Sequence, residues 1–140
     1  MMKVFYQTQA TATGGRAGRT ELNDGSLGFD LTPFTAEKQG VNPEQLFALG
    51  YAACFDSALN LVAQKMSLPL VSSKTSVQIG IGQVMSGAYK LQAQISVYTT
   101  GLTAEQANEL VHKAHEVCPY SNAIKNNVEV TLEAIIQEEK

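Results

Sequence analysis

The sequence predicts an α+β fold in which antiparallel sheets pack around one buried central helix. The strongest observation is the segment 42–66, the most apolar long stretch of the chain. Apolar residues alternate with a period of two on both sides of this segment, and with a helical period between residues 103 and 118. With 140 residues and 44% hydrophobic composition, the chain can bury a core without disulfide bonds. We therefore expect a single domain over residues 1–140.

The first part of the chain is predicted to form strands joined by glycine-rich turns. Residues 3–12 are rich in β-branched and aromatic residues and threonine, which is typical of a strand. The segment GGRAGR, residues 14–19, then places three glycines in five positions and holds both arginines of the protein. Asp24-Gly25 is a strong turn signal and predicts a hairpin of residues 19–22 with residues 26–31.

A polar connection, residues 32–41, leads into the central helix. Asn42 is a suitable N-cap, Pro43 suits the first helical position, and Gln45 completes the spacing of a capping box. Apolar or small residues follow at nearly every position until Ser67-Leu68-Pro69 ends the helix. Because the helix is apolar almost all round, we expect it to be buried on most sides.

A second hairpin follows the central helix. Apolar residues alternate with polar ones in segments 77–81 and 89–97, and a glycine-containing turn at residues 85–88 joins the two segments. The segment 89–97 alternates over five repeats and is the clearest strand in the sequence.

A helix and a last strand complete the chain. Thr103 to Gln106 form a capping-box pattern that predicts the start of the helix. The helix should end at Cys118, because a residue that precedes proline is disfavoured in the helical region. A short turn or helical piece then leads to a strand with alternating apolar residues over 128–132.

Composition excludes several classes of function. Ten Lys and Arg against thirteen Asp and Glu, with no basic run, argue against a nucleic-acid partner. The first fifteen residues contain no apolar core of a signal peptide, and no stretch is expected to be long and apolar enough to span a bilayer. We therefore expect a cytoplasmic protein with no membrane partner, whose two cysteines are reduced or redox-active.

Cys54 lies about eleven positions into the central helix, too far from its N-terminus for the helix dipole to act on the thiol. Burial alone would raise the pKa of this thiol. If Cys54 is a nucleophile, a side-chain cation must therefore stabilise its thiolate, and Arg16 and Arg19 are the candidates. The alternative is a small core residue without chemistry. Spacing leaves both interpretations open.

Cys118 lies 64 residues after Cys54, at the end of a helix. One thiol in a packed helix and another at a mobile boundary suit a peroxidatic and a resolving cysteine. The alternatives are two unrelated buried thiols, or a metal site that combines Cys118 with His112 and His115. The metal site is disfavoured because these residues, at i, i+3 and i+6, do not share one helix face. Two solvated histidines are the simpler expectation.

Glu44 is the only carboxylate in the first turns of the central helix. It provides either a favourable charge at the helix N-terminus or a partner that holds an arginine in place. Glu44 and Cys54 are ten residues apart, about 15 Å along one helix. If both serve one site, the economical solution is a homodimer in which antiparallel central helices bring Glu44 of one chain near Cys54 of the other.

Four segments, in order along the chain, resemble the signatures of the organic hydroperoxide resistance (Ohr) proteins within the OsmC/Ohr family. They are GGRAGR (14–19), NPEQLFALGYAACF (42–55), GIGQ (80–83) and VCPYSNA (117–123). The resemblance extends from the first strand to the last. It implies the OsmC/Ohr-like fold and an intertwined homodimer with two active sites at the interface.

The resemblance also implies residue roles. Cys54 corresponds to the peroxidatic cysteine and Cys118 to the resolving cysteine, Arg16 would activate the thiolate, and Glu44 would orient Arg16. Arg19 fits a family pattern but is given no catalytic role. The implied activity is thiol-dependent reduction of organic hydroperoxides, with no bound cofactor. A dithiol, typically dihydrolipoamide on a lipoylated protein, would reduce the resulting disulfide.

Aromatic residues near Cys54 are expected to bind substrate, namely Phe47, Tyr51, Phe55 and Tyr120. Apolar substrate surface gains roughly 25 cal/mol per Å² on burial, so this lining favours alkyl and fatty-acid hydroperoxides over hydrogen peroxide. Two departures from the family pattern are noted. The connection before the central helix is shorter than is common, and Asp56 stands where a less polar residue is expected, which would alter access to the pocket.

Overall fold

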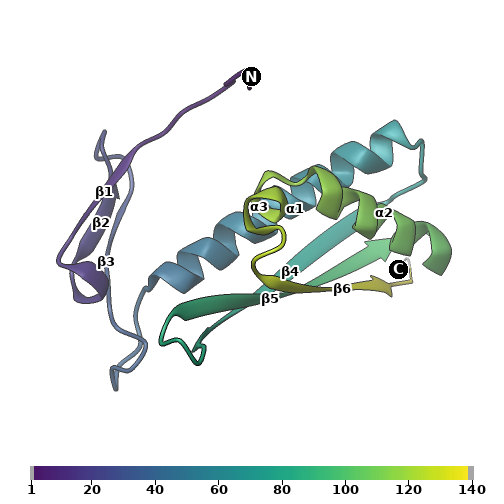
Figure 1. The fold of residues 1–140 in the computed structure, drawn as a ribbon. Helices are drawn as coiled ribbons and strands as arrows, with labels where there is room; N and C mark the ends of the chain where they lie inside the picture. The colour runs from purple at the N-terminus through teal and green to yellow at the C-terminus, as the bar shows by residue number, and fades with distance from the viewer. Residues whose placement is uncertain (1, 139–140) are drawn as a thin grey trace. The chain divides into compact units, whose positions relative to one another are not determined.

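The computed structural model describes residues 2–138, and the chain divides into two compact units. The first unit extends to Leu46 and the second begins at Phe47 (Figure 1). The expectation of a single domain stays a prediction. The predicted α+β class is confirmed, since each unit contains a sheet and the second also contains helices.

The first unit contains a three-stranded antiparallel sheet in the order β1-β2-β3. Its strands are β1 (Ala10–Thr13), β2 (Arg19–Leu22) and β3 (Gly28–Asp30). The predicted turn joins β2 and β3, and the backbone N–H and hydroxyl of Ser26 donate to the Asp24 carboxylate at 2.9 and 2.6 Å. This local hydrogen bonding confirms the predicted hairpin.

The strand predicted over residues 3–12 is shorter in the structure. Only Ala10 and the residues after it pair in a ladder, and the side chains of Phe5 and Tyr6 are 88% and 81% exposed. High β-propensity does not form a strand without a partner, and the described part of this single chain provides no partner for residues 3–8.

Helix α1 (Pro43–Lys65) begins as predicted. The backbone N–H of Gln45 donates to Asn42 Oδ1 at 2.9 Å, and the backbone N–H of Asn42 donates to Gln45 Oε1 at 3.0 Å. These two bonds are the predicted capping box. Beyond the last turn, Ser67 adopts a left-handed conformation with φ of 55°, which stops the helix.

The expectation that α1 is buried on most sides is wrong for the single chain. Only six of its 23 residues are buried, and Leu49 and Leu61 are 68% and 50% exposed. The second sheet and its helices cover one face of α1, and the opposite face stays open.

Helix α1 also contradicts the expectation that no stretch is long and apolar enough to cross a membrane. An 18-residue window within its 23 residues has a mean hydropathy of 1.5, and one third of that window is buried. Core helices of soluble proteins meet the same criterion, and part of α1 does pack into a core. The match is therefore weak evidence for a membrane span.

The second unit contains a three-stranded sheet in the order β4-β5-β6. Its elements are β4 (Ser72–Gln83), β5 (Tyr89–Thr100), α2 (Ala104–Val117), α3 (Pro119–Ile124) and β6 (Glu129–Ile136), together with α1 from Phe47 onward. Strands β4 and β5 form the predicted antiparallel hairpin, but β6 runs parallel to β5. The expectation of antiparallel sheets is wrong for β6, because helices α2 and α3 form a crossover that returns the chain in the same direction as β5.

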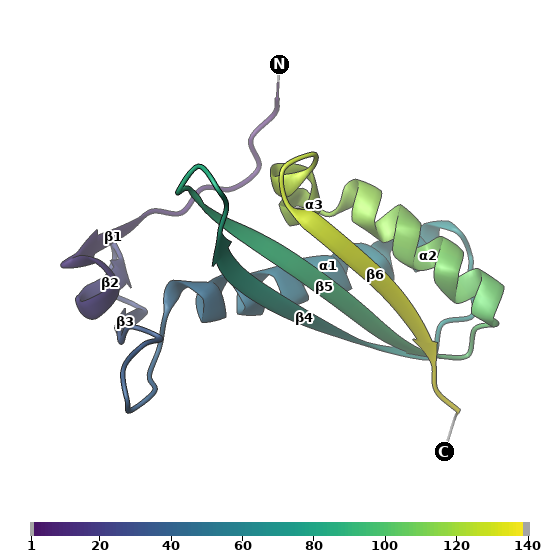
Figure 2. The ribbon, with the colours of Figure 1, turned by 60° about the horizontal axis from the view of Figure 1, so that its bottom comes forward.

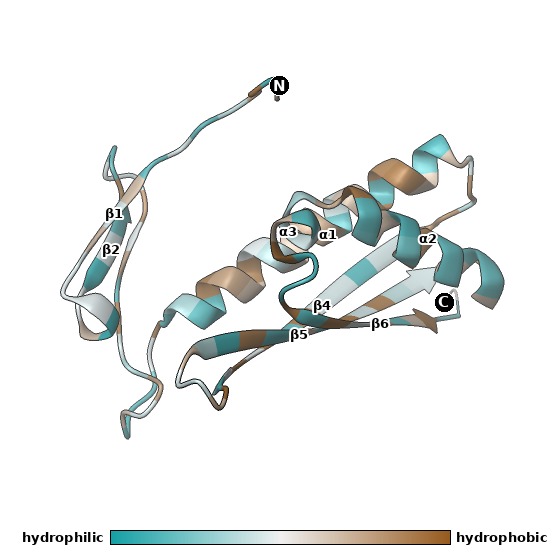
Figure 3. Ribbon diagram, in the orientation of Figure 1, coloured by the Kyte–Doolittle hydropathy of each residue, from teal (hydrophilic) through white to brown (hydrophobic). Residues whose placement is uncertain are grey.

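One face of this sheet is covered by helices, as Figure 2 shows. Ile95 and Val97 of β5 point into the core, where they meet α1 and α2. Helix α2 has the predicted capping box between Thr103 and Gln106, and it buries an apolar stripe that includes Leu110. Figure 3 shows that α1 is apolar or neutral along most of its length, whereas the visible side of α2 is largely hydrophilic.

Candidate active site

Cys54 and Cys118 lie together in the second unit. Cys54 is in the middle of α1, and Cys118 occupies the junction between α2 and α3, where Pro119 begins the next helix. Both cysteines are free thiols, and the Cys118 Sγ donates a hydrogen bond to the Cys54 Sγ over 3.5 Å. A disulfide bond is about 2.0 Å long, so closure requires the sulfurs to approach by only about 1.5 Å.

The two thiols differ in accessibility and protonation. Cys118 is completely buried, whereas Cys54 is partly exposed and is the thiol that a reagent would reach. Burial raises the pKa of Cys54, and the neighbouring Cys118 thiol adds to this effect, while a hydrogen bond from the backbone N–H of Tyr120 opposes it. The surroundings of Cys54 in this unit therefore favour the neutral thiol, which agrees with the expectation that activation requires a cation.

Arg16 and Glu44 form an ion pair in the first unit. Nη1 and Nη2 of Arg16 donate to Oε2 and Oε1 of Glu44 at 2.7 and 2.5 Å. This two-point contact fixes the plane of the guanidinium group, which also lies 5.9 Å from the centre of the Phe34 ring. The hydrogen bonds from Arg16 hold the pKa of Glu44 below its usual value, although burial opposes the shift.

Glycines shape the loop that presents Arg16. Gly14 has φ of 79°, in the left-handed region, and precedes a short 3-10 turn over Gly15–Ala17. A Cβ atom on Gly18 would lie 1.8 Å from the carbonyl oxygen of Thr13, so only glycine fits at this position. The GGRAGR segment therefore forms a compact turn with Arg16 in its middle.

The structure brings the four predicted catalytic residues together in two pairs. Arg16 and Glu44 meet in the first unit, and Cys54 and Cys118 meet in the second. Contact between Arg16 and the Cys54 thiol stays a prediction. Arg19 pairs with Asp30 of the neighbouring strand at 3.1 Å, an exposed contact that suits its lack of an assigned catalytic role.

The four aromatic residues predicted to bind substrate form one cluster. The Tyr51 ring lies 5.7 Å from Phe47, 6.5 Å from Phe55 and 6.0 Å from Tyr120. Tyr51 and Phe55 are fully buried, whereas Tyr120 is 40% exposed and Phe47 is partly exposed. In this conformation only Phe47 and Tyr120 offer surface to an apolar ligand.

Asp56 forms hydrogen bonds with the second sheet. Its carboxylate accepts hydrogen bonds from the hydroxyls of Ser73 and Thr75, at 2.9 and 2.8 Å. Both hydroxyls belong to strand β4, so Asp56 attaches α1 to the sheet, and its effect on access to the pocket stays a prediction.

The histidines of α2 have separate partners. The exposed His112 contacts the Asn108 carbonyl through Nδ1, as a solvated histidine can, whereas the half-buried His115 contacts the Ser121 hydroxyl through Nδ1 at 2.8 Å. The described residues contain no group of three or more His, Cys, Asp or Glu that could hold a metal ion. Sequence reasoning did not single out Ser121, although it lies inside the VCPYSNA segment.

Known proteins resemble the whole chain. A family model described as OsmC-like protein matches residues 36–133. The organic hydroperoxide resistance protein OhrB of Bacillus subtilis is 44% identical over 133 residues, which cover 92% of this chain and 97% of that protein. The organic hydroperoxide resistance protein of Xanthomonas axonopodis pathovar citri is 46% identical over 136 residues, which cover 93% of this chain and 94% of that protein.

A solved structure with a similar fold is also an organic hydroperoxide resistance protein. The crystal structure of an organic hydroperoxide resistance protein from Elizabethkingia anophelis, with thiocyanate bound, has a TM-score of 0.90 and 42% identity. The match covers 97% of this chain and 100% of that chain. The chain belongs to the OsmC/Ohr family. Glu44, Cys54 and Cys118 lie inside the stretch that the family model matches, and Arg16 lies before it.

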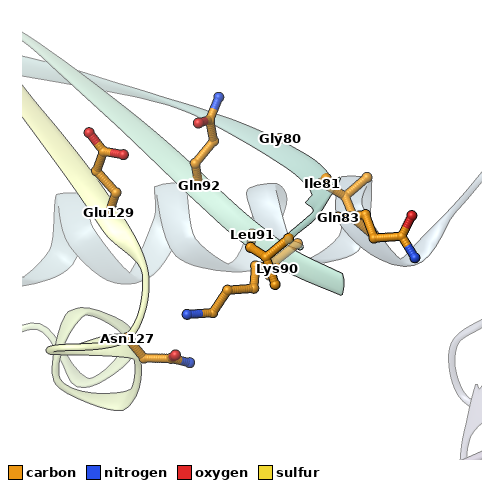
Figure 4. Close-up of a pocket in the computed structure, with 10 residues that line it drawn as sticks. Gly80, Ile81, Gln83, Lys90, Leu91, Gln92, Asn127 and Glu129 are labelled. Carbon is orange, nitrogen blue, oxygen red and sulfur yellow. The ribbon is translucent and has the colours of Figure 1, made fainter. Parts of the chain in front are cut away.

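The GIGQ segment of this OsmC/Ohr chain lines a separate hollow of about 420 Å³ at the hairpin end of the second sheet. Because glycine has no side chain, Gly80 and Gly82 leave space on β4. This space lies beside Lys90 and Gln92 of β5 and Glu129 of β6. Figure 4 shows the labelled residues of these strands with α1 behind the sheet. Neither cysteine lines this hollow, so it is distinct from the thiol pair.

Proposed function

We propose that the protein is a thiol-dependent peroxidase that reduces organic hydroperoxides to alcohols, as part of the response to oxidative stress. The observation that supports this most directly is the distance of 3.5 Å between two free thiols, of which one is partly exposed and the other completely buried. The names of the relatives in Bacillus subtilis and Xanthomonas, organic hydroperoxide resistance proteins, support the same class of substrate.

The proposed reaction has two steps on the protein. The Cys54 thiolate attacks the terminal oxygen of the hydroperoxide, the O–O bond breaks, and the leaving alkoxide takes a proton to become the alcohol. Cys54 is then a sulfenic acid. Cys118 loses its proton and attacks the Cys54 sulfur, which releases water and forms the disulfide. An external dithiol then reduces the disulfide and is itself oxidised to a disulfide.

Arg16 is proposed to stabilise the Cys54 thiolate, and Glu44 to orient Arg16. Burial raises the pKa of the Cys54 thiol, so a cation near the sulfur is needed to populate the reactive form at neutral pH. The ion pair between Arg16 and Glu44 supports this role, because it fixes the guanidinium group while the Arg16 side chain stays 42% exposed.

The substrate, the reductant and the assembly follow from the same proposal. Phe47 and Tyr120 would contact the alkyl chain of the hydroperoxide, with Tyr51 and Phe55 packed behind them. Dihydrolipoamide on a lipoylated protein is the proposed dithiol. We propose a homodimer that forms through the open face of α1, and a cytoplasmic location, in which reduced thiols persist.

Replacement of each cysteine tests the two roles. Cys54→Ser is expected to abolish reduction of cumene hydroperoxide in the presence of dihydrolipoamide. Cys118→Ser should still form a sulfenic acid at Cys54, detectable by dimedone labelling, but no disulfide. Sustained turnover by Cys54→Ser would exclude the mechanism. Oxidation of the wild-type thiols without steady-state turnover would instead indicate a redox sensor.

Alkylation of Cys54 by iodoacetamide across pH tests the role of Arg16. Arg16→Ala should move the midpoint of the alkylation profile to higher pH by about one unit or more, because the thiolate loses its cation. Arg19→Ala is the matched control, since Arg19 pairs with Asp30 and not with Glu44. An Arg16→Ala profile identical to the wild-type profile would rule out the proposed activation.

A further inference from the structure

A buried hydroxyl joins three helices beside the thiol pair. The Ser121 hydroxyl on α3 lies 2.6 Å from the Tyr51 hydroxyl on α1 and 2.8 Å from Nδ1 of His115 on α2. Ser121 is 2% exposed and Tyr51 is completely buried, so water does not compete for the hydrogen bond between them, whereas His115 is half-buried. The result is a continuous row of polar groups that runs from the apolar core to the half-buried His115.

Two of these residues flank Cys118 in the sequence, and the third lies on the helix that carries Cys54. His115 comes three residues before Cys118 and Ser121 comes three residues after it, so their hydrogen bond closes the turn that carries the Cys118 thiol. Tyr51 lies three residues before Cys54 in the same helix. Its bond to Ser121 therefore ties that turn to the helix that carries Cys54.

Two helices of different length meet at this turn. Cys118 links a 14-residue helix to a helix of only six residues, and its backbone is extended with ψ of 124°. A six-residue helix has little stability of its own. A bond between distant parts of the chain is therefore one feature that fixes the orientation of α3, and with it the position of Cys118.

We propose that Tyr51, Ser121 and His115 form a positioning clamp that holds Cys118 against Cys54 for disulfide closure. The three residues act through the cysteines and do not touch the reacting oxygen. Their effect should appear in the rate at which Cys118 attacks Cys54, because a fixed pair of thiols loses less freedom when it reaches the bonding geometry.

This inference rests on the proposed function for its biological meaning, but its test needs no peroxide. An aromatic disulfide that releases the coloured thionitrobenzoate anion reacts first with the accessible Cys54 and forms a mixed disulfide. Cys118 then loses its proton and attacks the Cys54 sulfur, the mixed disulfide breaks, and a second thionitrobenzoate leaves. The second release reports closure directly, and Cys118→Ser should lack it.

Variants of the three clamp residues are compared with a variant of the neighbouring His112. Ser121→Ala, Tyr51→Phe and His115→Leu should slow the second release roughly five- to tenfold, the loss expected for one buried hydrogen bond. His115→Asn places an amide group near the position of Nδ1 and should restore much of the rate. His112→Leu is the matched control on the same helix and should behave like the wild type, because His112 bonds only within α2.

Three results would overturn the clamp. They are an unchanged second release in Ser121→Ala and Tyr51→Phe, an equal loss in His112→Leu, and no rescue by His115→Asn when circular dichroism shows that it is folded. The proposed function fails separately if the wild-type protein releases both thionitrobenzoate anions normally but does not turn over hydroperoxides. Slow closure in Ser121→Ala, with hydroperoxide oxidation of Cys54 at the wild-type rate, supports both.

Discussion

At the scale of single residues, the two thiols lie close together, but the surroundings of Cys54 disfavour its reactive thiolate form. Cys54 and Cys118 are 3.5 Å apart, yet burial raises the pKa of Cys54 above that of a free thiol. A thiol in this environment resists adventitious oxidation until a cation stabilises its charged form. In the proposed mechanism, activation depends on a residue outside the cysteine motif, and the fixed guanidinium group of Arg16 is suited to that role.

The ion pair between Arg16 and Glu44 predicts a pH dependence of the loop that carries Arg16. The pKa of Glu44 is lower in the folded state than its usual value of 4.5, so the pair stabilises the loop fully above that pH. This contribution is lost as the pH falls through the lowered pKa. Limited proteolysis of residues 14–19 should therefore accelerate as the pH falls below 4.5.

Glu44→Gln is the control for this pH dependence. This variant keeps the shape of the side chain but lacks the titrating carboxylate, so its loop should be cleaved at a similar rate from pH 3.5 to pH 6. An equal acceleration of cleavage at low pH in wild type and Glu44→Gln would assign the effect to other carboxylates.

At the scale of elements, helices α1 and α3 approach closely because α1 carries a glycine at their contact. A Cβ atom on Gly50 would lie 3.1 Å from Cε2 and 3.2 Å from the hydroxyl oxygen of Tyr120. Gly50 precedes Cys54 by one helical turn, and Tyr120 follows Cys118 by two residues. The same contact therefore helps to set the spacing of the two thiols.

Gly50→Ala tests this contact through a double-mutant cycle. Alanine in a helix interior normally gains about 1 kcal/mol over glycine, but here the new methyl group crowds the Tyr120 ring. We expect little or no gain in urea unfolding for Gly50→Ala alone. In a Tyr120→Ala background the same substitution should stabilise by about 1 kcal/mol. Equal effects in both backgrounds would show that the ring does not limit this position.

At the scale of the whole molecule, helix α1 is only partly covered by its own chain. The buried face of α1 packs with the second sheet and α2, while Leu49, Ala53 and Leu61 lie on the opposite, exposed side. Exposed large apolar side chains on a helix that is apolar along most of its length are typical of an association surface. The proposed homodimer would bury Leu49, Ala53 and Leu61.

Lysine substitution tests the association surface. Leu49→Lys combined with Leu61→Lys should shift sedimentation from dimer to monomer, because each buried lysine would carry an uncompensated charge. Glu109→Lys, on the exposed face of α2, is the control and should leave the dimer intact. A wild-type protein that sediments as a monomer, or a double variant that remains dimeric, would contradict the proposal.

Local features of the fold could be predicted from the sequence because neighbouring residues create them. The capping box of Asn42 and Gln45, the one at Thr103, and the turn at Asp24 depend on hydrogen bonds between residues two or three positions apart. The alternation of apolar and polar residues in strand β5 likewise matches the alternation of side chains that face the core and side chains that do not. The motifs also indicated the roles of both cysteines, through resemblance to the Ohr proteins.

Other features depended on contacts between distant residues, which no local pattern encodes. The parallel pairing of β6 depends on how α2 and α3 return the chain. The exposed side of α1 depends on how much of the chain is available to cover it.

The sequence by itself determined the helix and turn boundaries and, through its motifs, the family and the candidate thiols. Only the tertiary structure decided that the thiols lie 3.5 Å apart and that Ser121 joins Tyr51 to His115. The physical reason is distance along the chain: Tyr51 and Ser121 are 70 positions apart, and only the packing of α1 against α3 brings their hydroxyls within hydrogen-bonding distance.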